Sequence, residues 1–66
     1  MAYRNGQYAN STVFELLRKA YDVLNETSDR SQSLLLIYQA LEVARATDNR
    51  VLRAHVTQCS EYVKRI

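Results

Sequence analysis

The chain contains no proline and a single glycine, Gly6, among its 66 residues. Tight turns between β-strands depend on glycine or proline, and both residue types are unfavourable inside a helix. A chain that nearly lacks both is therefore expected to form helices joined by short polar turns. Its length allows one domain.

The spacing of apolar residues predicts three helices, over about residues 12–25, 30–46 and 50–66. The second carries two adjoining apolar stripes, which predicts that it packs between the other two. Asp29, followed by Gln32, is a candidate N-cap, and each residue of Thr47-Asp48-Asn49 could cap the third helix. The third has the most regular pattern, with spacings of four and three residues at Leu52, Val56, Cys59, Val63 and Ile66.

These helices predict an all-α fold, either a three-helix bundle or a bent helical hairpin plus a third helix. Residues 1–10 are predicted to form a flexible N-terminal arm, and residues 11–66 a single three-helix domain. A chain this short buries only about 60% of its unfolded surface. Cys59 is the only cysteine and His55 the only histidine, so neither an internal disulfide nor a zinc site is expected to add stability. Very good helix packing or oligomerisation is therefore expected to stabilise the chain.

Charge is distributed unevenly along the chain. Residues 1–10 carry +1, residues 11–48 carry −2 and residues 49–66 carry +3, which together give the net charge of +2. The basic third helix is a mild indication of an anionic partner. The first ten residues are too polar for a signal peptide, and no apolar run is long enough to span a membrane. We therefore expect a cytoplasmic protein that does not contact the membrane.

Residues with catalytic potential are few. His55 and Cys59 are four residues apart and thus share one helix face, but that face is the apolar one, and no third ligand or orienting acid is evident. Both are expected to pack in the core, where a cysteine behaves as a small apolar residue. The sequence also lacks the common phosphate-loop, dinucleotide, nucleophile-elbow and zinc-protease motifs. We expect no enzymatic activity and no cofactor.

The third predicted helix carries a polar stripe without acidic residues. Arginine, lysine and hydroxyl side chains are common partners of phosphate oxygens, so the stripe could follow a DNA backbone with weak sequence specificity. Arg4 on the arm could add a further contact. A helix-turn-helix motif fits poorly, because the second helix is long and the turn after it has no glycine. The stripe consists of Arg50, Arg53, Thr57, Ser60 and Lys64.

From Val13 to Ile66 the chain resembles the bacterial YmgB/AriR family of small biofilm and acid-resistance regulators. The resemblance lies in three segments: Ser11-Thr12-Val13-Phe14, the run from Leu34 to Glu42 (LLLIYQALE), and the run from Val51 to Val56 (VLRAHV). It implies a homodimer of three-helix protomers that regulates transcription or a stress response without catalysis. Such a protein would either bind DNA with weak sequence specificity or connect to a signalling protein.

Two functions thus remain open, beside a purely structural role in a larger assembly. The first is a homodimeric regulator that contacts the DNA backbone through the polar stripe and Arg4. The second is a connector or inhibitor that binds a regulatory protein through a helix face, with Leu35 and Tyr38 as the expected contacts. Leu35 lies on the polar side of the second predicted helix, where a large apolar residue suits a subunit contact.

Overall fold

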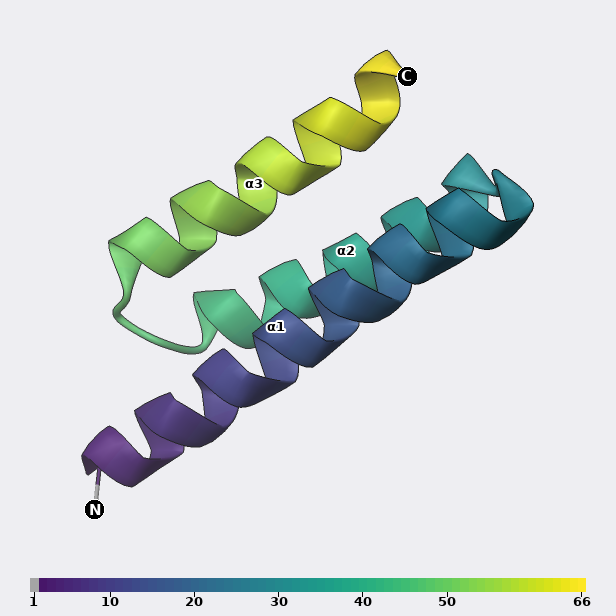
Figure 1. Ribbon diagram of the computed structural model, residues 1–66. Helices are drawn as coiled ribbons and strands as arrows, with labels where there is room; N and C mark the ends of the chain where they lie inside the picture. The colour runs from purple at the N-terminus through teal and green to yellow at the C-terminus, as the bar shows by residue number, and fades with distance from the viewer. Residues whose placement is uncertain (1) are drawn as a thin grey trace.

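Residues 2–66 form three helices and no strand, which confirms the predicted all-α class. The structure is a computed structural model that describes the backbone of residues 2–66 and the side chains of residues 10–66. Helix α1 spans Ala2–Thr27, α2 spans Arg30–Arg45 and α3 spans Arg50–Arg65. The helices run up, down and up, so α1 and α3 point the same way (Figure 1).

The turn between α1 and α2 is built from side-chain contacts to the backbone. Asp29 caps α2, and its carboxylate accepts a hydrogen bond from the Gln32 backbone N–H at 3.0 Å, as predicted. Thr27 donates its hydroxyl to the Val23 carbonyl oxygen at 2.7 Å and accepts from the Asp29 N–H at 3.2 Å. Ser28 has a positive φ of 58°, the left-handed conformation that commonly ends a helix.

The turn between α2 and α3 repeats much of this chemistry. Asn49 is the residue that caps α3, and its side-chain oxygen accepts from the Leu52 N–H at 3.0 Å. Thr47 donates to the Ala44 carbonyl oxygen at 2.8 Å and accepts from the Asn49 N–H at 3.3 Å. Both turns therefore satisfy helix-end groups locally.

The predicted start of the first helix is wrong. The helix begins at Ala2 and not near Thr12, so residues 2–10, predicted as a loose arm, are helical. Asn10, Ser11 and Thr12 offer capping oxygens, but a helix that is already formed gains one backbone hydrogen bond for each residue it adds, and no proline stops it. The side chains of Tyr3, Arg4 and Tyr8 lie outside the described residues.

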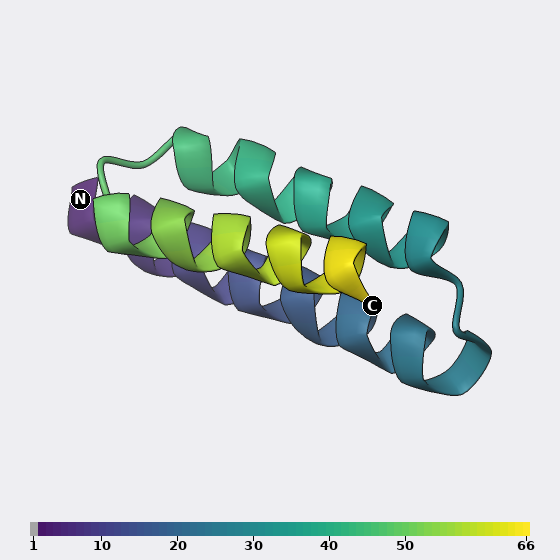
Figure 2. The ribbon, with the colours of Figure 1, turned by 90° about the horizontal axis from the view of Figure 1, so that it is seen from above.

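Helix α2 packs against both other helices, as its two apolar stripes predicted, while α1 and α3 touch each other at few places. Figure 2 shows the three helices running lengthwise alongside one another, joined by turns at opposite ends. Ile37, Ala40 and Ala44 are fully buried at this centre. Among the described residues, no helix is long and apolar enough to cross a membrane. Among the residues whose side chains are described, the buried core consists of Val13, Leu17, Ala20, Ile37, Ala40, Ala44, Leu52, Val56, Cys59 and Val63.

Candidate interaction surfaces

The predicted polar stripe of α3 lies along the edge that faces α2. Arg50, Thr57 and Lys64 are exposed and Arg53 is half-buried. Ser60 is only 4% exposed, so its side chain is not available to a phosphate. The stripe is therefore interrupted in its C-terminal half, because Ser60 turns toward the packed interior between α2 and α3.

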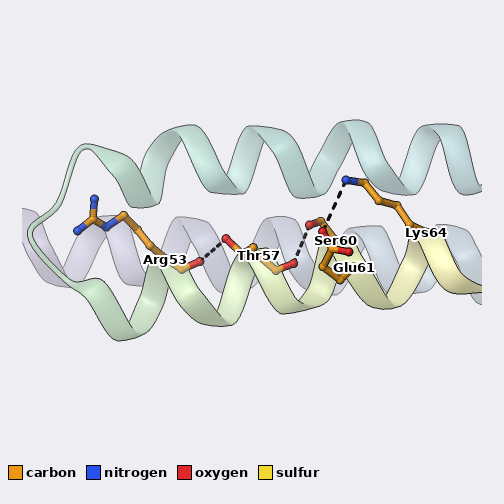
Figure 3. A network of polar contacts seen from close by, with 5 residues as sticks. All are labelled: Arg53, Thr57, Ser60, Glu61 and Lys64. Carbon is orange, nitrogen blue, oxygen red and sulfur yellow. Dashed lines mark hydrogen bonds and ion pairs between the residues drawn. The ribbon is translucent and has the colours of Figure 1, made fainter.

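The two hydroxyl groups of the stripe are used inside the helix. Thr57 donates to the Arg53 carbonyl oxygen at 2.9 Å, and Ser60 donates to the Thr57 carbonyl oxygen at 2.7 Å (Figure 3). A hydroxyl has one proton, so neither group can donate to an external phosphate without breaking its bond to the backbone. The stripe thus offers cations at its ends and satisfied hydroxyls between them.

Lys64 has local partners, and one of them is acidic. Its Nζ lies 3.8 Å from the Glu61 carboxylate and 5.7 Å from the centre of the Tyr38 ring. A hydrogen bond with Tyr38 is the main cause that raises the pKa of the Lys64 ammonium, and the charge of Glu61 contributes less. Figure 3 shows Lys64 reaching toward α2, whereas Arg53 points to the α2–α3 turn. The stripe is therefore not free of acidic influence, and its cations are divided between two places.

The two residues predicted to contact a partner protein lie on the outer side of α2. Leu35 is 56% exposed and Tyr38 is 42% exposed. Because Tyr38 lies beside Lys64, the structure brings part of the predicted protein surface next to part of the predicted DNA surface. Leu35 and Tyr38 are three residues apart on one helix side and are two isolated apolar groups, not a large patch.

A larger set of exposed apolar side chains lies on the face that α1 and α3 form together, which we call the aromatic face. Helical spacing puts Val51 and Tyr62 beside the apolar side of α3 and Phe14 beside that of α1, but spacing alone does not indicate that they remain exposed. They do so because α1 and α3 scarcely touch. The exposed residues are Phe14 at 53%, Val51 at 79%, Tyr62 at 54% and Ile66 at 53%.

Two ring pairs connect the helices across the aromatic face. The Phe14 and His55 rings have their centres 6.1 Å apart, and the Tyr21 and Tyr62 rings 6.3 Å apart. Their planes are tilted by 55° and 59°, within the range that aromatic pairs favour. Phe14 and Tyr21 are seven residues apart, as are His55 and Tyr62, so the pairs repeat every two turns along two parallel helices.

The surface has hollows beside both ring pairs. One, of about 250 Å³, lies at the end of the face that holds Phe14, Val51 and His55. The other, of about 860 Å³, lies at the opposite end. Arg30 is the only Lys, Arg, Asp or Glu among the described residues that line the two. The larger hollow is lined by Tyr21, Leu24, Asn25, Ser28, Arg30, Tyr62 and Ile66.

The expectation for His55 and Cys59 is half right. Cys59 is buried, whereas His55 is exposed and packs on the Phe14 ring, because it lies toward α1 where the helices separate. The Cys59 Sγ and His55 Nε2 atoms are 3.9 Å apart. Burial, and then a hydrogen bond with Cys59, raises the pKa of Tyr21 to about 12. No group of three metal-ligating residues forms among the residues that the structure describes.

Comparison of the chain with protein-family models, with curated proteins and with solved structures gives no match. The resemblance to the YmgB/AriR family therefore stays a prediction that rests on the three quoted segments.

Proposed function

We propose that this chain is a non-catalytic binding protein whose aromatic face binds the surface of another protein molecule. The observation that carries the proposal is the gathering of Phe14, Val51, Tyr62 and Ile66, each more than half exposed, on one face of a small bundle. This is the second of the two functions considered from the sequence, moved from Leu35 and Tyr38 to a different surface.

Burial of this face is energetically favourable, because each Å² of apolar surface removed from water contributes about 25 cal/mol. Exposed apolar groups gathered in one place are typical of protein contact sites, and aromatic side chains are enriched at the centre of such sites. The Tyr62 ring combines apolar area with a hydroxyl that can stay in contact with water at the rim. Among the described residues, Arg30 is the one Lys, Arg, Asp or Glu that lines the two hollows of the face, so filling them needs little removal of water from charges.

Site-specific photo-crosslinking in cells tests the proposal. A photoreactive amino acid at position 62 should give a defined protein adduct, whereas the same group at Gln39, exposed on α2, should give little. Phe14→Ser should reduce the adduct formed at position 62, since both residues lie on the aromatic face. Absence of any protein adduct at position 62 would contradict the proposal.

A second candidate is contact with the DNA backbone. One observation favours it: Arg45, Arg50 and Arg53 flank the α2–α3 turn, where they could meet one phosphate strand. Arg45 was not among the predicted contacts, and Glu42, 3.7 Å away, partly neutralises it. Lys64 is distant from this group, and the resemblance alone supports a role in transcription, biofilm or stress regulation.

Fluorescence anisotropy of a labelled duplex, at about 50 and 200 mM salt, tests the second candidate. DNA contact predicts binding that weakens steeply with salt and that is lost in Arg53→Glu. Arg65→Glu, the same two-unit change of charge on another side of α3, is the control for general repulsion and should weaken binding less. Equal binding by Arg53→Glu and the parent protein would exclude this candidate.

A further inference from the structure

We infer that the surface covering the aromatic face is a second copy of this chain, placed so that Val51 of each copy packs into the larger hollow of the other. The inference rests on the proposed function and names its partner. The arrangement has a two-fold axis crossing the helices, so the end that carries Val51 meets the end that carries Tyr62 and Ile66, twice.

The composition of the core is the first argument. None of the ten buried core residues is aromatic, and three of them are alanines. The largest fully buried side chains are Ile37, Val13, Val56 and Val63. Small bundles that lack disulfides and metals need unusually good packing or a partner subunit. Here the larger rings of the described chain lie outside the core, where a second subunit could bury them.

The size of the face is the second argument. The backbone measures 39 × 17 × 12 Å, and α1 and α3 lie on either side of α2, so their shared face is one of the two broad ones. The shared face can be no longer than α3, whose 16 residues span roughly 24 Å, so with a width of 17 Å it covers roughly 400 Å² before side chains extend the edges. A standard complex buries about 800 Å² on each partner and weaker ones less than about 600 Å², so the face has the size of a small dimer interface.

Charge is the third argument. A face that binds its own copy meets the same charges that it presents, so any strong charge of one sign would repel. The two hollows are lined by apolar and neutral polar groups apart from Arg30. A nucleic acid would require several cations here, and a strongly basic partner would require acidic groups that the linings lack. The face is therefore suited to another face of the same character.

Shape is the last argument. Val51 is the most exposed large apolar residue, and the hollow at the far end of the face has walls of Tyr21, Leu24, Tyr62 and Ile66. A two-fold dimer pairs residue i with j and also j with i, so a projection at one end and a hollow at the other are satisfied together. The ring pairs Phe14–His55 and Tyr21–Tyr62 lie along the face between the projecting Val51 and the larger hollow.

Analytical ultracentrifugation over a range of concentrations tests the inference, with Val51→Asp as the main variant. Position 51 lies in the first turn of α3, where an acidic residue favours the helix, so the variant should fold, as circular dichroism can verify. The substitution places two charges in the dimer. We expect the dimer dissociation constant to rise by at least about 100-fold. Leu35→Asp, on the outer side of α2, is the matched control and should leave it unchanged.

A disulfide experiment tests the orientation. In a Cys59→Ser background, Val51→Cys and Ile66→Cys are introduced together; these positions are about 22 Å apart along α3, so a bond between them must join two copies. Oxidation should give a covalent dimer in which mass spectrometry finds a 51–66 link. A 51–51 link in its place, or loss of the dimer in Leu35→Asp but not in Val51→Asp, would overturn the inference.

The outcomes also separate this inference from the proposed function. A wild-type chain that stays monomeric at high concentration, yet forms an adduct with a different protein at position 62, overturns the self-association and supports the proposed function. A monomer without any adduct overturns both.

Discussion

The two flanks of α3 differ in how their side chains are satisfied. On the flank toward α2, the polar groups find partners within the chain: Thr57 and Ser60 donate to carbonyl oxygens, and Lys64 lies near Glu61 and Tyr38. On the flank toward α1, Val51 and Tyr62 stay more than half exposed although they continue the apolar side of the helix. The polar flank is largely closed, and the apolar flank is open.

This difference shows that a side chain's neighbours in space, and not its polarity, decide whether it is available to a partner. A stripe of hydroxyls and cations is a weak site when the hydroxyls bond to the backbone. Apolar residues at helical spacing become an interaction surface when one neighbouring helix lies too far away to cover them. The predictions below test the closed flank first and then the open one.

The largest effect is expected from a charge at Ser60. Because Ser60 is buried on the closed flank, Ser60→Asp places a carboxylate out of water, and even with Lys64 one turn along the helix the lost hydration should cost several kcal/mol. We expect the variant to be largely unfolded by circular dichroism and urea titration. Thr57→Asp, one turn away and exposed, is the control and should stay folded. A stable Ser60→Asp protein would mean that this flank is open to solvent.

The fold could be predicted from the sequence more fully than the surfaces. Both turns were located correctly, because capping depends on residues within one helical turn. The signals were Asp29 with Gln32 for the first turn and the run Thr47-Asp48-Asn49 for the second. The start of α1 could not be located in this way, because side-chain oxygens that are able to cap a helix do not force the helix to begin there. The exposure of Val51 and the burial of Ser60 depend on the separations of α1, α2 and α3, which no local pattern encodes.

The next effect concerns the N-terminal cap of α3, where both flanks start. Asn49 fixes the first turn of α3, which carries Arg50 and Val51, so Asn49→Ala should cost about 1 kcal/mol. Hydrogen exchange should show faster exchange in the first turn of α3 than in its last turns. Asp29→Ala removes the equivalent cap from α2 and should leave exchange in α3 nearly unchanged. Equally faster exchange in α2 and in α3 in Asn49→Ala would mean that this cap does not act on α3 alone.

A smaller effect is expected at the C-terminal end of the closed flank. Lys64 and Glu61 are both about half exposed, so water and salt weaken their attraction. Lys64→Ala and Glu61→Ala should each leave the urea midpoint unchanged within error, at low and at high salt. A clear salt-dependent loss in both variants would show that the ion pair, and not the packing of Val63 beside it, holds this end of α3 in place.

The last effect, absent at neutral pH, concerns the inner edge of the open flank. An unfolded tyrosine has a pKa of about 10, whereas burial and the bond with Cys59 raise the pKa of Tyr21 to about 12 in the folded chain. The unfolded state therefore loses this proton first, so the stabilisation is present below pH about 10 and falls as the pH rises toward about 12. Tyr21→Phe should reduce that alkaline loss in denaturation measured at about pH 9 and 11. An identical loss in both proteins would mean that water reaches the Tyr21 hydroxyl as freely as it reaches the Tyr62 hydroxyl. The face between α1 and α3 would then have no water-excluded part at Tyr21 for a partner to contact.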